Sequence, residues 1–185
     1  MNTRDRLIQI VGAERFSDDK TVLYCYSRDV SLAKGIPDYV VQPLSTEEVA
    51  TIVSLMNEYE ISITPRGAGS GTAGGAVPVK GGIVLDMRRM NKILSVEIEN
   101  LQVCVEPGVI HANVNKELAK YDFFFPPGPA SSEHCTIGGM IANDASGMST
   151  VKYGTTKNYV LDLEVVLPDG KIINTGSAVQ KSVAG

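Results

Sequence analysis

The chain has 185 residues, a hydrophobic content of 43% and a formal net charge of −4 at pH 7. These values are typical of a soluble globular protein with one sizeable core. The acidic balance argues against a nucleic-acid partner, because such partners are bound mainly through phosphate contacts. No apolar run approaches the ~20 residues that a transmembrane helix needs, and the polar N-terminus has no signal-peptide pattern.

The three cysteines, Cys25, Cys104 and Cys135, are odd in number and widely spaced. This pattern is typical of reduced thiols in a cytoplasmic protein, and not of a disulfide framework. There is no Cys-x-x-Cys pair, and His134 beside Cys135 has no third ligand at a suitable spacing. We therefore expect a cytoplasmic protein without a metal site, and a loop position for His134.

The first 64 residues predict a β–α–β unit. Residues 3–12 are expected to form a short helix, residues 21–26 a strand or irregular segment, and residues 39–41 a short strand between two prolines, on an edge of a sheet. Ser45 and Glu48 form a capping box. A helix with one buried face is then predicted from apolar residues at i, i+3, i+4 and i+7. They are Val49, Ile52, Val53 and Met56. Residues 61–64 alternate as a strand.

The glycine-rich segment at residues 65–75 is the most informative part of the chain. It contains five glycines within the nine positions from Gly67 to Gly75. Without side chains, consecutive backbone amides can approach a bulky anion and adopt positive φ angles. A flexible linker is the alternative, but linkers do not usually separate two strands inside a domain. We interpret the segment as a cradle for phosphate or pyrophosphate.

Two familiar phosphate motifs do not fit this cradle. Residues 69–74 match G-x-G-x-x-G, and Asp86 lies near the distance of a ribose-binding acid. A dinucleotide fold, however, needs a helix after the loop, whereas Pro78 and the strand-like residues 83–86 follow here. No Gly-Lys-Ser/Thr closes the loop as in a Walker A motif. The sequence therefore predicts a strand–loop–strand cradle.

The second half alternates short strands, helices and loops. Strands are expected at residues 93–97 and 101–106, with a turn at Asn100 and with Leu101, Val103 and Val105 facing inward. A helix is expected at residues 111–121, with His111 as a capping or surface residue. Phe123–Phe125 is expected in the core.

The remaining segments are a short helix and a hairpin. Residues 136–143 are expected to form a helix thinned by two glycines, with Thr136 as its N-cap. A hairpin is expected from residues 159–167 and 171–174 around a Pro-Asp-Gly turn. Lys152 and Tyr153 either reach a phosphate or flavin or are ordinary turn residues.

Four lines in this order resemble the FAD-binding domain of the vanillyl-alcohol oxidase/p-cresol methylhydroxylase superfamily. They are residues 65–71 (PRGAGSG), 125–131 (FPPGPAS), 136–139 (TIGG) and 163–170 (LEVVLPDG). Within that superfamily the chain is most similar to glycolate oxidase D subunits and FAD-linked D-lactate dehydrogenases. The resemblance implies an α+β, two-lobed FAD-binding domain of the p-cresol methylhydroxylase type, with the second lobe incomplete.

The resemblance also implies the site. The first glycine loop wraps the pyrophosphate, the 126–131 and 136–139 segments line the flavin and its ribityl chain, and residues around 142–147 approach from the other lobe. The implied FAD-binding residues are Pro65, Arg66, Gly67, Ala68, Gly69, Ser70, Gly71, Pro127, Gly128, Ser131, Thr136, Ile137, Gly138, Gly139, Ala142, Asn143 and Gly147. The Arg66 side chain either pairs with the pyrophosphate or points to solvent.

Two positions depart from the family pattern. Some members attach the flavin covalently through a histidine where this chain has Ser70, so non-covalent FAD is expected. Many relatives carry Asp where this chain has Gly128, so one polar contact near the flavin is missing or comes from elsewhere.

The resemblance implies an N-terminal extension at residues 1–36, a first FAD lobe at 37–106 and a truncated second lobe at 107–185, with no substrate domain. The chain ends soon after a hairpin, and we interpret it as the front part of a larger enzyme. That enzyme is expected to oxidise a small 2-hydroxy acid by hydride transfer to FAD, with a possible electron-transfer partner subunit.

The catalytic residues of that enzyme are expected outside this chain, which alone is expected to be inactive. The alternative is a stand-alone flavin- or nucleotide-binding module without its own oxidation chemistry. A more distant one is a reductase of the related cell-wall-precursor type.

Overall fold

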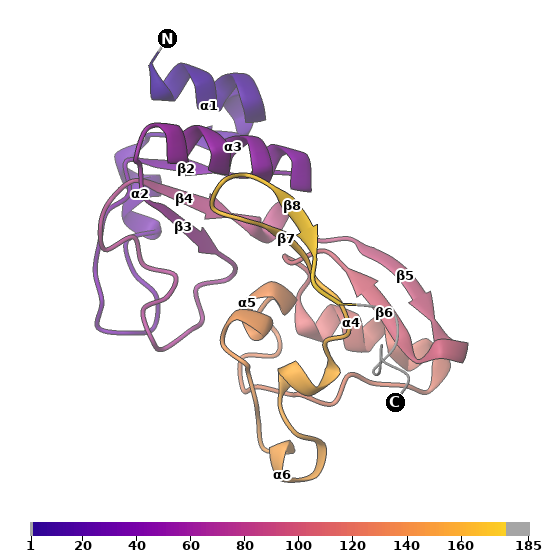
Figure 1. The fold of residues 1–185 in the computed structure, drawn as a ribbon. Helices are drawn as coiled ribbons and strands as arrows, with labels where there is room; N and C mark the ends of the chain where they lie inside the picture. The colour runs from indigo at the N-terminus through magenta and orange to yellow at the C-terminus, as the bar shows by residue number, and fades with distance from the viewer. Residues whose placement is uncertain (1, 177–185) are drawn as a thin grey trace.

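A four-stranded sheet in the first half of the chain carries the glycine segment (Figure 1). The computed structural model describes residues 2–176. The strands are β1 (Phe16–Ser17), β2 (Tyr39–Val41), β3 (Ile63–Arg66) and β4 (Ile83–Asp86), in the spatial order β1-β2-β4-β3. β4 lies between β2 and β3 and is parallel to both, while β1 is antiparallel to β2. The expected edge position of β2 is therefore wrong, because its flanking prolines lie outside the paired residues.

Helices cover both faces of this sheet. On one face α1 (Thr3–Val11) and α3 (Thr46–Glu58) pack on the strands (Figure 1). The shared core contains residues from both helices and from β2 and β4, among them Leu7, Val11, Val41, Ile52, Met56 and Ile83. On the other face α2 (Lys20–Cys25) packs through Leu23 against Val40 and Val84. Because α3 leads from β2 to β3, the predicted β–α–β unit is confirmed.

α2 occupies residues for which a strand or irregular segment was expected. Asp19 is the N-cap of this helix, and its carboxylate accepts the N–H groups of Thr21 and Val22 at 2.9 and 3.1 Å. A cap of this kind satisfies two of the free donors at the helix start. The cap and the packing of Leu23 outweigh the strand preference of a short β-branched and aromatic run.

The second half builds a separate core around an antiparallel strand pair, β5 (Ile93–Glu97) and β6 (Gln102–Val105). Val103 and Val105 pack toward this core as expected, but Leu101 turns outward. It has a φ of +54° after the 3-10 turn η3 (Ile98–Asn100), and such a left-handed residue directs the chain into the return strand.

Helices α4 (His111–Leu118) and α5 (Ile137–Ala142) complete the second core, with Val114 and Met140 fully buried. The short elements are η1 (Ala13–Arg15), η2 (Met87–Arg89), η4 (Ala119–Tyr121), α6 (Thr150–Tyr153) and η5 (Thr156–Tyr159). The Thr136 N-cap of α5 is confirmed, since its hydroxyl accepts the Gly139 N–H at 3.2 Å.

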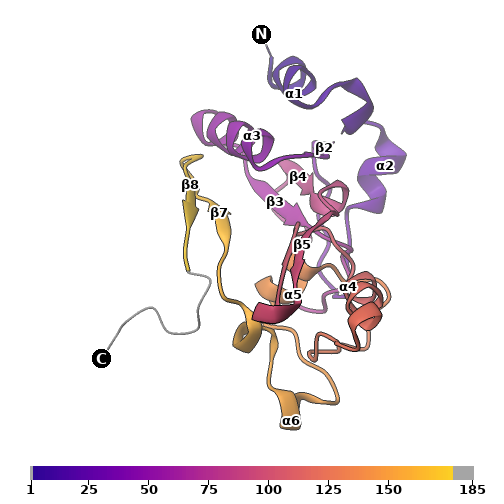
Figure 2. The same ribbon diagram turned by 90° about the vertical axis from the view of Figure 1, so that its right-hand side faces the viewer.

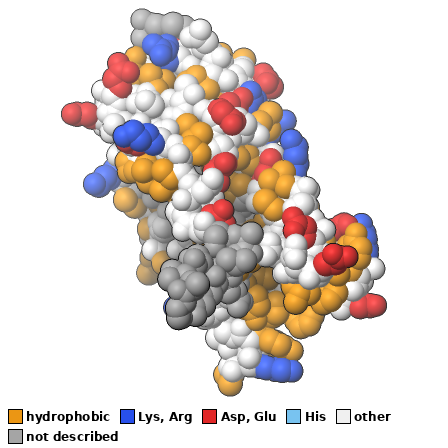
Figure 3. Space-filling view, turned by 45° about the vertical axis from the view of Figure 1, so that its right-hand side comes forward, with side chains coloured by type: hydrophobic (Ala, Val, Ile, Leu, Met, Phe, Trp, Pro, Cys, Tyr) orange, Lys and Arg blue, Asp and Glu red, His pale blue; other side chains and the backbone are white. Residues whose placement is uncertain are grey.

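Much of the Phe123–Phe125 run lies at the surface. Phe123 and Phe124 are 42% and 57% exposed, so the expected core position is wrong for both, and only Phe125 packs on the second core. Asp122 before them has a φ of +62°, which turns the chain out of the helix. Figure 3 shows hydrophobic side chains gathered near the lower end of the molecule.

A hairpin from the end of the described chain returns to the first half (Figures 1 and 2). It consists of β7 (Glu164–Val166) and β8 (Ile172–Asn174). The first strand is shorter than expected, because residue 159 belongs to η5 and residues 160–163 are irregular. Glu164 accepts a hydrogen bond of 2.5 Å from Thr46 at the start of α3. Gly170 has a φ of +83° and lies so close to α3 that a Cβ there would come within 2.9 Å of Ser54. Expectations for residues 177–185 lie outside the described residues.

Candidate functional site

The glycine segment connects β3 to β4 as a loop. Pro65 and Arg66 belong to β3, so the loop itself starts at Gly67. No helix directly follows β3: residues 67–82 contain only bends, turns and irregular backbone before β4 begins. Gly69 and Gly74 have φ angles of +69° and +81°, which glycine adopts without strain. The predicted strand–loop–strand arrangement is confirmed.

Arg66 braces this loop from its own strand. Its Nη1 donates to the Ala76 carbonyl at 3.0 Å, and its guanidinium lies 5.5 Å from the centre of the Tyr26 ring. A Cβ on Gly69 would overlap the guanidinium. Burial lowers the pKa of Arg66, although Asp29 acts in the opposite direction. The Arg66 side chain therefore packs against the protein, and it connects the two ends of the loop.

A buried carboxylate anchors the strand on the other side of the loop. Asp86 is fully buried and accepts hydrogen bonds from Tyr26 Oη at 2.7 Å, Gln42 Nε2 at 2.8 Å and Arg88 Nε at 2.9 Å. Burial acts to raise the pKa of Asp86, but hydrogen bonds from Arg88, Tyr26 and Gln42 outweigh it and hold the pKa below its usual value. Burial and the same carboxylate raise the pKa of Tyr26 to about 12.

The hydrogen-bond network of Asp86 bears on the function of this residue. The spacing of residues in the sequence does not reveal it. Since Asp86 already has three side-chain partners, it is not available as the ribose-binding acid of a dinucleotide fold. The only sequence signal was a charged residue ending a strand of apolar residues, Ile83–Asp86, all of which are buried.

The first glycine loop meets the helix start at Thr136. A Cβ on Gly67 would overlap the Thr136 hydroxyl, so the Thr136 side chain can pack against the loop backbone because position 67 is glycine. Gly138 is held against Pro107, to whose carbonyl it donates at 2.8 Å. Ile137 donates to Val109 at 2.8 Å and is buried. Two segments about seventy positions apart in sequence thus lie in contact.

A third segment closes the arrangement. A Cβ on Gly71 would lie 3.6 Å from Asn143 Nδ2 at the end of α5, next to the exposed Ala142. A Cβ on Gly147 would overlap the Gly128 carbonyl. The structure therefore brings Gly67 against Thr136, Gly71 near Asn143 and Gly147 against Gly128.

The other predicted site residues lie close to these contacts or outside them. Ala68 and Ser70 are half-buried within the loop, and Pro127 is buried beside Gly128. The Ser131 carbonyl accepts the N–H groups of His134 and Cys135 at 2.8 Å each, which folds the chain back toward Thr136. Pro65 is exposed within β3.

Some glycines here have no structural reason within the described residues. Gly71 and Gly128 have no positive φ, and a Cβ on either would meet only one atom, at 3.6 and 3.8 Å. Neither backbone conformation nor packing against the protein excludes a side chain at these positions. They leave open space beside backbone amides, which fits a bulky phosphate-containing ligand.

His111 is the main residue that the sequence interpretation missed. It opens α4 as expected but is only 2% exposed, so the surface expectation is wrong. Its Nδ1 lies 2.7 Å from Ser132 Oγ, and its ring packs 5.7 Å from the Phe125 ring. No local pattern distinguishes a buried histidine at a helix start from an exposed one.

The remaining candidates from the sequence are His134, Lys152 and Tyr153. His134 is exposed and lines a small hollow of about 230 Å³ with Arg88 and Asn113. Among residues 2–176 no group of three His, Cys, Asp or Glu side chains is placed to hold a metal ion. The Lys152 ammonium lies 4.8 Å from the centre of its neighbour's ring, Tyr153, in α6. No described helix is long and apolar enough to cross a membrane.

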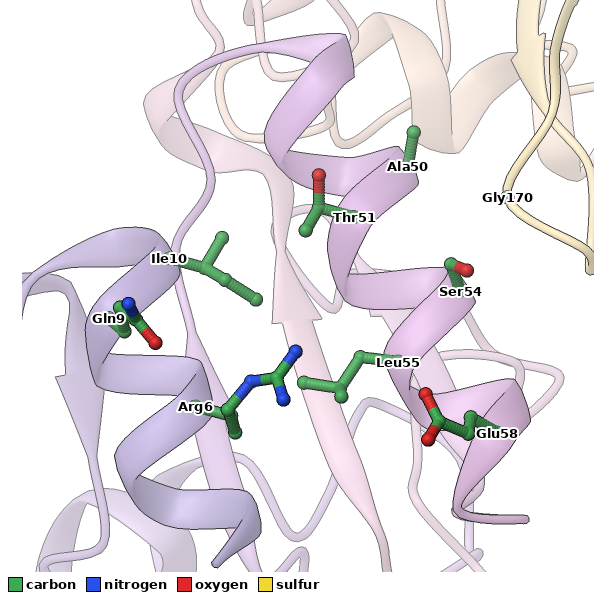
Figure 4. A pocket seen from close by; sticks show the side chains of 9 residues that line it. All are labelled: Arg6, Gln9, Ile10, Ala50, Thr51, Ser54, Leu55, Glu58 and Gly170. Carbon is green, nitrogen blue, oxygen red and sulfur yellow. The ribbon is translucent and has the colours of Figure 1, made fainter. Parts of the chain in front are cut away.

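Another hollow lies between α1 and α3 (Figure 4). It measures about 570 Å³ and is lined by Arg6, Glu58 and the hairpin residue Gly170, among others. Arg6 points into the space between the helices (Figure 4). The hollow is open at the surface and contains none of the glycine-loop residues, so it is not part of the candidate site.

Comparison with known proteins shows the family of this chain. The family described as "FAD binding domain" matches residues 37–176. The glycolate oxidase subunit GlcD of Bacillus subtilis (strain 168) is 40% identical over all of this chain and 39% of its own length. The D-lactate dehydrogenase of Anaerostipes hadrus is 39% identical over 93% of this chain and 34% of its own length.

The fold comparison agrees. The structure of p-cresol methylhydroxylase with substrate bound matches with a TM-score of 0.82 and 24% identity, over 93% of this chain and 34% of that one. The expected α+β fold of the p-cresol methylhydroxylase type is confirmed. The chain spans about two fifths or less of the length of these three proteins.

Proposed function

The chain belongs to the FAD-binding domain family, and from this premise we propose that it is the FAD-binding part of a flavin-dependent 2-hydroxy-acid dehydrogenase. The whole enzyme would oxidise a hydroxy acid of the glycolate or D-lactate type to a keto acid. The relatives named glycolate oxidase subunit and D-lactate dehydrogenase support this substrate class. FAD, when bound, supplies the hydride acceptor.

The proposed site consists of the three converging segments. Backbone amides of residues 67–71 would bind the pyrophosphate, and Pro127, Gly128 and Ser131 would line the flavin. Residues 136–139 and 142–147 would hold the ribityl chain and the rest of the dinucleotide. The single observation that carries this assignment is the contact of Gly67 with Thr136, which supports a common site for two separate glycine-rich segments.

We propose non-covalent binding, because Ser70 cannot form the histidine–flavin bond of some relatives. We retain as proposals the division into residues 1–36, 37–106 and 107–185, and an electron-transfer partner subunit. The name "subunit" of the Bacillus relative supports the last of these. A cytoplasmic location is supported by free Cys25, Cys104 and Cys135, which suit a reducing compartment.

An absorbance titration tests the proposal. The purified chain mixed with FAD is expected to show a shifted flavin spectrum that stays with the protein on gel filtration. In the whole gene product, glycolate or D-lactate is expected to bleach the bound flavin anaerobically. Bound flavin that no 2-hydroxy acid bleaches there would contradict the enzyme assignment and favour a binding module, and NADPH-dependent bleaching would favour a reductase.

A further inference from the structure

The segment from Phe125 to Cys135 is attached at both ends to the start of α4. At its beginning, Phe125 N donates to Asn115 Oδ1 at 2.6 Å. At its end, Ala112 N donates to Ser132 O at 3.1 Å and His111 N to Cys135 O at 3.0 Å. The His111 imidazole lies between these ends, one helical turn from Asn115. We call this group, His111, Asn115 and Ser132, the α4 clamp.

The hydrogen bonds of the clamp determine the tautomer of His111. Asn115 Oδ1 must face Phe125 because it accepts a backbone N–H, so Asn115 Nδ2 faces His111 Nε2, at 3.3 Å. An amide NH₂ can only donate, which leaves Nε2 without hydrogen. The hydrogen is therefore on Nδ1, which donates to Ser132 Oγ at 2.7 Å. A proton on Nε2 would place two donors face to face.

The surroundings of the ring favour its neutral form. Burial lowers the pKa of His111, while the carbonyls of Phe125 and Pro127 and the negative charge of Glu133 act in the opposite direction and are outweighed. Burial also raises the pKa of the Cys135 thiol, which stays uncharged nearby. The clamp is thus assembled around an uncharged imidazole at neutral pH.

We propose that His111, as its neutral Nδ1–H tautomer, is a positioning residue that sets the path of the Pro126–Ser131 segment. The inference rests on the proposed function, which assigns Pro127, Gly128 and Ser131 to FAD. His111 does not contact the reacting atoms in this proposal. It acts through Ser132, which directly follows the segment, and through Asn115, which accepts the N–H of Phe125 directly before the segment.

Two substitutions separate the clamp from simple packing. His111→Asn keeps an amide donor near the position of Nδ1, whereas His111→Phe keeps a flat ring and removes both nitrogens. We expect His111→Phe to raise the FAD dissociation constant of the 185-residue chain about tenfold at pH 7.5, and His111→Asn to stay within about threefold. Leu118→Ala, at the far end of the same helix, is the control for lost stability, and its folded form should bind FAD like the wild type.

Spectroscopy tests the tautomer directly. Nitrogen-15 chemical shifts of the His111 ring are expected to show a protonated Nδ1 and a bare Nε2 at pH 7.5. Lowering the pH to 5.5 should weaken FAD binding by the wild type more than by His111→Asn, because only the wild-type ring can gain a proton.

Four results would be decisive against one or other proposal. Wild-type FAD affinity in His111→Phe, or a hydrogen on Nε2 at pH 7.5, would overturn the clamp. Complete absence of FAD binding by the whole gene product would overturn the proposed function instead. In that case the tautomer and the slow hydrogen exchange of the Phe125 amide would still support the clamp, and a fast-exchanging amide would overturn it.

Discussion

At the level of single residues, the glycines of the site have different reasons to be glycine. Gly67 is closed in by Thr136, so its side-chain position is filled by the protein itself. Gly71 is open, with one neighbouring atom at 3.6 Å. The first kind brings two segments of the chain together, and the second leaves room for a ligand. Alanine at position 67 should therefore mainly lower stability, whereas alanine at position 71 should mainly weaken ligand binding.

We expect Gly67→Ala to lower the free energy of unfolding by about 1–3 kcal/mol, as for other overpacked positions. Gly71→Ala should leave it unchanged within about 0.5 kcal/mol but weaken FAD binding about tenfold, since its methyl group would occupy ligand space. Thermal melting and FAD titration of both variants measure this. Unaltered FAD affinity in Gly71→Ala would show that position 71 does not face the cofactor.

The buried carboxylate at position 86 predicts a pH dependence. The folded-state pKa of Asp86 is lowered, so its stabilising effect is present above the unfolded value and is lost as the pH falls through the folded value. We expect Asp86→Asn to lower stability by about 2–3 kcal/mol at pH 7, less than for a fully buried pair, because the Arg88 side chain is 50% exposed.

Urea unfolding at pH 7 and pH 3 would measure both effects. The difference in stability between wild type and Asp86→Asn should shrink at the lower pH. A difference that stayed constant would mean that folding does not lower the pKa of this carboxylate.

At the level of elements, α3 shows how local signals position the sheet. Ser45 is its N-cap, and the Ser45 hydroxyl accepts the Glu48 N–H at 3.3 Å. Only this half of the predicted capping box forms. The Glu48 carboxylate binds Arg15 and the Leu44 N–H instead, at 2.5 and 2.8 Å. Because Arg15 lies in η1, Glu48 in the first turn of α3 attaches the N-terminal segment to this helix.

We expect Ser45→Ala to lower the free energy of unfolding by about 1 kcal/mol, the usual effect of removing an N-cap. Ser45→Asp, which keeps a cap acceptor, should retain wild-type stability within about 0.5 kcal/mol. The urea midpoint provides the measurement. Equal losses in both variants would show that the hydroxyl is not acting as a cap.

At the level of the whole molecule, the two cores are interlocked. The β7–β8 hairpin follows the second core in sequence but packs on α3 of the first, through Glu164 and Gly170. The glycine loop of the first half contacts Thr136 of the second. A ligand between these segments should therefore stabilise both halves together.

We expect FAD at one hundred times its dissociation constant to stabilise the chain by about 2.7 kcal/mol. Hydrogen exchange should slow together at the amides of residues 67–71 and 138–143. Protection confined to one of the two segments would mean that the ligand binds only one half of the molecule.

The sequence by itself determined the local parts of this protein. Glycine content, the missing helix after residue 75 and the 3.6-residue period of α3 are properties of neighbouring residues, and all three agree with the structure. Four short motifs in order were sufficient to identify the family. Periodicity, capping residues and composition act over a few positions, so they can be recognised without the rest of the fold.

Only the tertiary structure decided what these parts do to one another. It buried His111, exposed Phe123 and Phe124, and made a helix of residues 20–25. It also brought Gly67 against Thr136, residues far apart in sequence. Such outcomes depend on which distant segments pack together, because burial and contact energies outweigh the small local preferences of any single residue.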